Sequence, residues 1–160
     1  MLILITVGTQ NFSFNRLLKM VDELMEDKVI TDKVLGQVGY SSYQPIYYEG
    51  FGFKPESEMT ELIELADIMI THAGVGTITT ALQLRKKVIV VPRLKQYGEH
   101  VDDHQLEIAQ AYRQKGYIEL AKNKEELAYL LKNINSINFQ NYIPEKSTIL
   151  SSIQDYIANI

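Results

Sequence analysis

The chain has 160 residues and a formal net charge of −4, with 46% apolar and 22% charged residues. This balance is typical of a single globular domain with one core. The acidic charge argues against a broad nucleic-acid-binding surface, which needs clustered Lys and Arg. The sequence has no cysteine, which excludes disulfides, thiolate metal sites and cysteine nucleophiles.

The first eight residues are apolar, but they lack the basic leader and the length of a signal peptide. No stretch approaches the roughly 20 apolar residues that a bilayer-spanning helix needs. We therefore expect a cytosolic protein, with any membrane contact peripheral or made through a partner.

The first half of the chain alternates strand and helix patterns. Leu2–Thr6 is a continuous apolar run, as in a strand buried on both faces. Apolar residues at helical spacing over 14–25 predict a helix, with Ser13 as a candidate N-cap. Residues 34–38 and, more weakly, 47–51 are strand candidates.

The same alternation continues. A helix is expected to begin at Pro55, and residues 68–71 predict a second buried strand. A helix over 78–84, a strand over 88–91 and a helix over 102–115 follow.

Asn123 with Glu126 then resembles a capping box at the start of another helix. Strands alternating with helices pair in parallel through right-handed crossovers. We therefore expect an α/β fold, a single Rossmann-like doubly wound parallel sheet over 1–134. A linker over 135–147 and a C-terminal amphipathic helix over 148–160 would follow.

In an open α/β sheet, ligands bind beyond the carboxyl ends of the strands. Three polar or glycine-bearing segments, 7–11, 72–77 and 93–105, follow predicted strands. We expect them to meet at one edge of the sheet and to form a site there.

The segment 72–77 carries the sharpest signal. Gly74 and Gly76 let the backbone approach a ligand closely, and Thr77 adds a hydroxyl. The helix that follows offers unpaired N–H groups and a positive dipole end, which together bind phosphate. A plain strand-to-helix turn is an equal alternative. Neither a dinucleotide fingerprint nor a P-loop occurs in the chain.

Two other features near this turn allow two readings each. Gly8 and Thr9 close the first strand and would present donors to the same phosphates, or they form only a tight turn. His72 either orients the phosphate-binding turn or is a satisfied residue at the end of a strand.

The segment 97–105 is dense in polar groups. His100 and His104 are four residues apart with Asp103 beside them, which admits a metal site, although no H-E-x-x-H motif is present. Alternatively, Asp102, Asp103 and Gln105 bind sugar hydroxyls. The third alternative is a solvated helix N-terminus with favourable acids in its first turn.

Taken together, these segments resemble the C-terminal domain of glycosyltransferase family 28, which includes the GlcNAc transferase of peptidoglycan synthesis. The likeness covers about residues 1–120. The chain is also similar to stand-alone small subunits of bacterial exopolysaccharide and capsule transferases, and to the soluble subunit of the eukaryotic dolichol-linked GlcNAc transferase. The segments that carry the likeness are 7–10, Phe14, 16–18, 72–77, 88–93 and 99–109.

This resemblance implies the C-terminal lobe of a GT-B fold, in an inverting transferase that is cut in two. The chain would bind a UDP-sugar, with galactose as the first expectation and GlcNAc as the second. No metal or other cofactor is expected. A membrane-associated partner at the inner face of the membrane would bind the lipid-linked glycan acceptor and supply the base, in exopolysaccharide or capsule synthesis. The alternative is a non-catalytic enhancer that stabilises such a partner.

Position by position, the resemblance implies contacts with the diphosphate or sugar from Gly8 and Thr9. The diphosphate would be held by His72, Gly74, Val75, Gly76 and Thr77. The sugar hydroxyls would meet Asp102, Asp103 and Gln105. Thr80 stands where many relatives carry a ribose-binding Glu, so either Glu99 holds the ribose or it is held differently.

The last helix allows two arrangements. It docks on the partner lobe, as C-terminal helices cross over in GT-B folds, or it packs on its own domain. An exposed docking face would also favour self-association of the isolated chain.

Overall fold

The structure is a computed structural model that describes residues 1–144 and 149–159. At its centre lies a six-stranded sheet of order β3-β2-β1-β4-β5-β6, in which every neighbouring pair is parallel. This is the order of a doubly wound Rossmann fold, and it confirms the predicted fold class. The strands are β1 (Leu2–Thr6), β2 (Lys33–Gln37), β3 (Glu49–Phe51), β4 (Ile68–Thr71), β5 (Lys87–Val90) and β6 (Glu119–Leu120).

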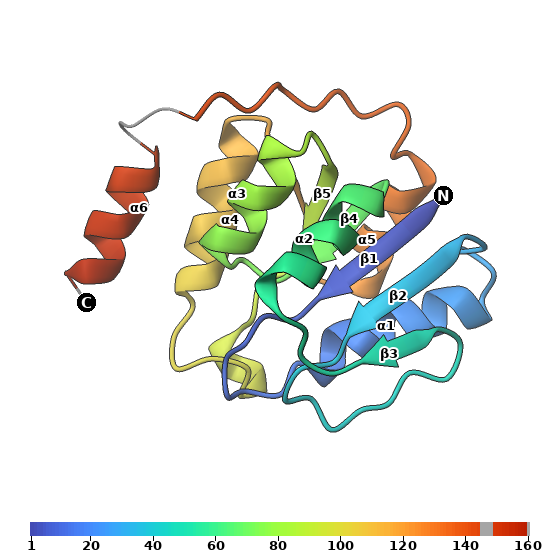
Figure 1. Ribbon diagram of the computed structural model, residues 1–160. Helices are drawn as coiled ribbons and strands as arrows, with labels where there is room; N and C mark the ends of the chain where they lie inside the picture. Colours follow the sequence, from blue (N-terminus) through green and yellow to red (C-terminus); the bar gives the residue numbers. More distant parts are fainter. Residues whose placement is uncertain (145–148, 160) are drawn as a thin grey trace.

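Helices cover both faces of the sheet (Figure 1). One core joins the sheet to α1 and α5, and a second core joins it to α2, α3 and α4. The helices are α1 (Asn15–Glu26), α2 (Glu56–Leu65), α3 (Val75–Gln83), α4 (His104–Gln114), α5 (Lys124–Lys132) and α6 (Ile149–Ala158). A short 3-10 turn, Lys95–Tyr97, lies between β5 and α4.

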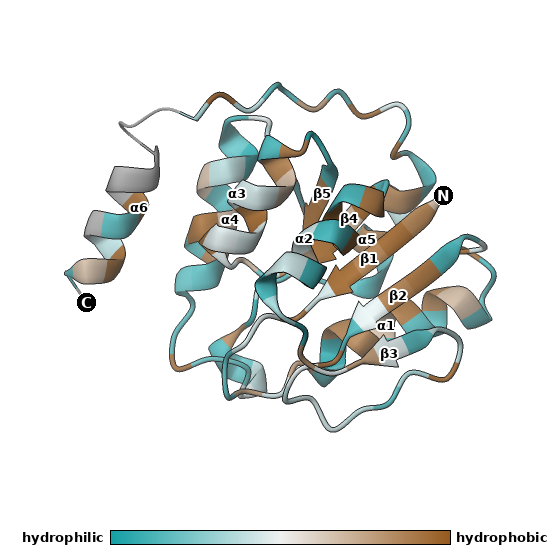
Figure 2. Cartoon of the chain, in the orientation of Figure 1, coloured by the Kyte–Doolittle hydropathy of each residue, from teal (hydrophilic) through white to brown (hydrophobic). Residues whose placement is uncertain are grey.

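Strand β1 shows why the central strands are continuously apolar. Ile3 and Ile5 point into the core beneath α1 and α5, whereas Leu4 points into the core beneath α2, α3 and α4. All three are at most 2% exposed. The hydropathy colouring shows the same apolar centre, with polar residues on the outer faces of the helices (Figure 2). A strand buried on both faces has no polar side, so its sequence does not alternate.

Two helices begin at different residues from those predicted. Helix α3 begins at Val75 rather than 78, because the N–H of Ile78 already donates to the carbonyl of Gly74 (3.0 Å). The glycine segment therefore forms the first turn of the helix. Helix α4 begins at His104 rather than 102, and the N–H of His104 donates to the carboxylate of Asp102 (3.0 Å).

Three other boundaries need correction. Ser13 is not the N-cap of α1; that position is Phe14, which has no side-chain cap and whose N–H donates to Ser41 Oγ (2.9 Å). Strand β2 begins one residue earlier than predicted, and β3 is shorter. Strand β6 was not predicted, since its two residues are too few to show a period.

The predicted cap of α5 is confirmed. The side chain of Asn123 accepts a hydrogen bond from the N–H of Glu126 (2.8 Å). The carboxylate of Glu126 turns back to the N–H of Lys122 (2.7 Å) rather than to that of Asn123. The two side chains still satisfy two otherwise unpaired donors at this helix end.

Helix α6 lies against α4. Ile153 is buried in this contact, and the ring of Tyr156 meets that of His104 edge-on with centroids 5.0 Å apart. The structure thus shows the arrangement in which the helix packs on its own domain. Residues 145–148 and 160, at the predicted end of the linker and of the last helix, lie outside the described residues. In the described part of the chain, no helix combines the length and apolar character needed to cross a bilayer.

Candidate functional site

The sheet reverses its winding between β1 and β4, and a crevice forms there at the carboxyl ends of the strands. Thr6 pairs with Thr71 in the last register of these strands, and the N–H of His72 donates to the carbonyl of Thr6 (3.2 Å). The segments 7–12 and 72–77 therefore leave the sheet side by side. We call them the first and the second glycine turn.

The second glycine turn presents free backbone donors. Gly74 caps α3 without a side-chain hydrogen bond, and in the part of the chain that the structure describes no group accepts from the N–H groups of residues 74–77. The first N–H groups of a helix have no partner inside it. Together with the helix dipole, they form a ready anion-binding site.

His72 explains why both turns need glycine. A Cβ on Gly8 would lie 2.4 Å from His72 Nε2, and a Cβ on Gly74 would lie 2.4 Å from His72 Cε1. Gly8 also has a φ of +78°, which side-chain-bearing residues rarely adopt. The imidazole thus fills the space between the two turns and sets their separation.

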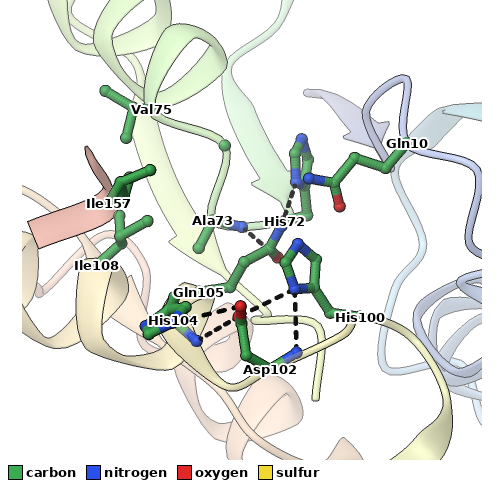
Figure 3. Close-up of a pocket in the computed structure, with 11 residues that line it drawn as sticks. Gln10, His72, Ala73, Val75, His100, Asp102, His104, Gln105, Ile108 and Ile157 are labelled. Carbon is green, nitrogen blue, oxygen red and sulfur yellow. Dashed lines mark hydrogen bonds and ion pairs between the residues drawn. The ribbon is translucent and has the colours of Figure 1, made fainter. Parts of the chain in front are cut away.

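Two pockets flank the first turn of α3. The α4 pocket is lined by His72, Gly74, Val75, Asp102 and Gln105, with Gln10, His100, His104 and Ile157 at its sides (Figure 3). The α2 pocket lies on the other side and is lined by Gly8, Thr9, Lys54, Gly76, Thr77 and Thr80, among others. One helix N-terminus therefore serves both pockets.

Gln105 bonds three groups at the base of the α4 pocket. Its Oε1 accepts from the N–H of Ala73 (3.3 Å) and of Arg93 (3.1 Å), and its Nε2 lies 3.3 Å from His72 Nδ1. Burial, and next the charge of Arg93, lower the pKa of His72 to about 3. His72 is therefore neutral at physiological pH.

Asp102 lies between two histidines. Its Oδ1 is 3.0 Å from His100 Nδ1, and its Oδ2 is 3.3 Å from His104 Nε2 (Figure 3). Asp103 does not join them, because its carboxylate accepts from the N–H of Lys95 (2.8 Å). Among residues 1–144 and 149–159, no three His, Asp or Glu side chains are arranged to hold a metal ion.

Glu99 lines neither pocket. It is 3% exposed, and its carboxylate accepts two hydrogen bonds from Arg16 (2.8 and 2.9 Å) and one from the N–H of Leu94 (2.9 Å). This position counts against Glu99 as the ribose contact. It favours the alternative in which the ribose is held differently, since Thr80 lines the α2 pocket.

The predicted site residues thus separate into two groups. The structure brings together, around the first turn of α3, Gly8, Thr9, His72, Gly74, Val75, Gly76, Thr77, Asp102 and Gln105. Glu99 bonds to Arg16 of α1 and to the N–H of Leu94 instead, and Asp103 bonds to the N–H of Lys95.

Three residues of this region were given no contact in the predicted site, although Gln10 and Arg93 lie within the predicted segments 7–11 and 93–105. Gln10 lines the α4 pocket, Lys54 lines the α2 pocket, and Arg93 anchors the first glycine turn from below. Lys54 follows the carboxyl end of β3, so the rule that found the other segments could have found it.

A parallel sheet of this order, with a helix N-terminus at its switch point, is a Rossmann-like fold, which the GT-B glycosyltransferases share. The fold agrees with a solved glycosyltransferase of kitacinnamycin, with a TM-score of 0.65 and 17% identity over 99% of this chain and 39% of that chain. It also agrees with the solution structure of ALG13, with a TM-score of 0.60 and 20% identity over 93% of this chain and 91% of that chain.

The family follows from the sequence match. The model of the glycosyltransferase family 28 C-terminal domain matches residues 2–160, and the chain belongs to this family. A curated relative, the UDP-N-acetylglucosamine transferase subunit ALG13 of Candida albicans, is 36% identical over 88 residues. That match covers 55% of this chain and 29% of the relative, so the chain matches less than a third of that protein.

Proposed function

We propose that the chain is the donor-binding subunit of a split, inverting glycosyltransferase, and that it binds a UDP-sugar across the first turn of α3. The observation that carries this proposal is the set of unpaired N–H groups at residues 74–77, between two pockets. Such donors stabilise the charge of a departing diphosphate without a metal ion.

The two pockets suggest which part of the UDP-sugar each one binds. The α2 pocket offers hydroxyls from Thr77 and Thr80 and the ammonium group of Lys54, which suit the nucleoside and its phosphates. The α4 pocket offers Asp102 and histidine side chains, which suit sugar hydroxyls. The diphosphate would then cross the N-terminus of α3.

N-acetylglucosamine is the sugar that the names of the relatives support, ahead of the galactose expected first. The acceptor in this proposal is a lipid-linked glycan, in exopolysaccharide or capsule synthesis. The curated relative ALG13, which the chain resembles, is named as a subunit of its transferase. We therefore propose a membrane-associated partner that binds the acceptor, carries the catalytic base and keeps this subunit at the inner face of the membrane.

Calorimetry with UDP on the purified chain tests the donor site. We expect weak binding that falls about fivefold to tenfold in Thr77→Val, because the substitution removes a hydroxyl from the α2 pocket. Thr79→Val is the matched control. Its hydroxyl bonds to the carbonyl of Val75 (2.7 Å) inside the same helix, so UDP affinity should not change.

The same titration separates the two functions. A non-catalytic enhancer would give no heat with UDP, and that result would refute the donor-subunit proposal. Sugar transfer provides a second check: the isolated chain should transfer little sugar, and robust transfer without a partner would contradict the split enzyme.

A further inference from the structure

The side-chain oxygen of Gln105 is fully occupied by hydrogen bonds within the protein. Gln105 is 4% exposed, and its Oε1 already accepts from two backbone N–H groups, those of Ala73 and Arg93. A carbonyl oxygen has two lone pairs, so this oxygen has no capacity left for a sugar hydroxyl. Its amide nitrogen faces His72 Nδ1 at 3.3 Å.

These bonds fix which nitrogen of His72 carries the proton. An amide NH₂ only donates, so His72 Nδ1 must accept, and a neutral ring then carries its proton on Nε2. Nε2 lies between the two glycine turns, because a Cβ on Gly8 or Gly74 would lie 2.4 or 2.6 Å from it. Among the described residues, no group accepts from this N–H.

Gln105 also links the two turns through the backbone. Its bond to the N–H of Ala73 fixes the second glycine turn just before its free donors. Its bond to the N–H of Arg93 fixes the residue whose guanidinium donates to the carbonyls of Val7 and Phe12 in the first glycine turn (2.5 and 2.8 Å). The side-chain amide of Gln105 therefore fixes the positions of both glycine turns relative to each other.

We propose that Gln105 is a positioning residue, which holds the His72 ring in the Nε2–H tautomer. The ring then presents one further N–H group to the phosphates of the UDP-sugar. This inference rests on the proposed donor-binding function. It gives Gln105 a role different from the sugar contact that the family resemblance implies, because the amide acts through His72 and the turns.

The tautomer can be read directly by long-range ¹H–¹⁵N correlation NMR of the ¹⁵N-labelled full chain, which has only three histidines. In the free protein at pH 7 we expect a neutral His72 ring with its proton on Nε2. In Gln105→Met the fixed tautomer should give way to a mixture, because the substitution removes the donor to Nδ1. Gln110→Met, the same change at an exposed position of α4, should leave the spectrum of His72 unchanged.

Calorimetry with UDP and with UDP-N-acetylglucosamine gives the second readout. Gln105→Met should weaken both ligands by about tenfold, because the lost donor serves the phosphates that they share. A loss confined to UDP-N-acetylglucosamine would overturn the proposal in favour of a direct sugar contact. Unchanged affinity for both ligands, or a wild-type His72 protonated on Nδ1, would also overturn it.

The two measurements still test the proposal if the variant does not fold or the wild-type chain does not bind UDP. Should Gln105→Met not fold, the wild-type ring spectrum decides alone. Should the wild-type chain bind neither ligand, the proposed function fails, while the free-protein spectrum still tests the tautomer.

Discussion

At the scale of single residues, Arg93 stands out as a buried cation beneath the site. It is 1% exposed, its guanidinium donates to the carbonyls of Val7, Phe12 and Glu99, and it stacks 4.9 Å from the centre of the Phe14 ring. Burial lowers its pKa to about 10, a shift that the charge of Glu99 opposes, so the group stays charged at neutral pH. Its planar fork suits several carbonyls at once.

The neutral state of His72 gives a pH dependence of stability. Its pKa is about 3 in the fold against 6.5 for the free side chain, so between these values the unfolded chain binds a proton that the folded chain does not. Stability therefore falls as the pH falls below 6.5. Between pH 7 and pH 5, His72 should remove about 2 kcal/mol of unfolding free energy.

Urea unfolding at pH 7, 6 and 5 measures this change. His72→Gln should show a shallower fall than the wild type, and since His100 and His104 are present in both proteins, the difference reports on His72. Parallel pH profiles would mean that folding does not lower the pKa of His72.

The two glycines of the second turn should respond differently to alanine. In Gly74→Ala the new Cβ would lie 2.4 Å from His72 Cε1, and this overlap should destabilise the fold by about 1–3 kcal/mol. In Gly76→Ala the Cβ meets no atom within 4 Å, so stability should stay unchanged or rise by up to about 1 kcal/mol. Chemical denaturation measures the free energy of unfolding of both variants. An equal loss in both would contradict the close contact between His72 and Gly74.

At the scale of elements, the strands buried on both faces were the most predictable. The bounds of β1 and β4 were predicted correctly, because a continuous apolar run has clear ends. The start of α3 was not, since Val75, Gly76 and Thr77 have low helix propensity and join the helix only through the surrounding fold. Strand β6 has two residues and is specified by its pairing with β5.

The candidate site was predicted in part for the same reason. The glycine turns follow buried strands, so strand ends were enough to find them. The partners of buried polar side chains cannot be read from a sequence. Gln105 reaches Ala73 across 32 residues, and Glu99 reaches Arg16 across 83. These long-range bonds decide that Glu99 faces inward and that Gln105 binds the turns.

At the scale of the whole molecule, two cores share one sheet. Leu4 and Ile5 are adjacent in β1 and fully buried, yet they belong to different cores on opposite faces. Because every core helix packs on strands that belong to the same hydrogen-bonded sheet, loosening one face removes support from the other. We therefore expect cooperative unfolding of both layers.

Leu4→Ala and Ile5→Ala test this expectation. Each should cost about 2–5 kcal/mol, because both side chains are 0% exposed. In each variant, far-UV circular dichroism and tyrosine fluorescence should report one coincident urea transition. The control Leu65→Ala, at a residue 69% exposed, should cost less than about 0.5 kcal/mol. Separate transitions for the two probes would indicate that the layers unfold independently.

The direction of β1 also determines where the protein tolerates an attachment. Met1 stands at the amino end of this five-residue strand, about 17 Å from the carboxyl edge where the pockets open. A dye, an affinity tag or a surface tether joined to Met1 would therefore leave both pockets clear. One joined after α6 would extend from a helix whose Ile157 lines the α4 pocket. It would therefore obstruct the opening of that pocket.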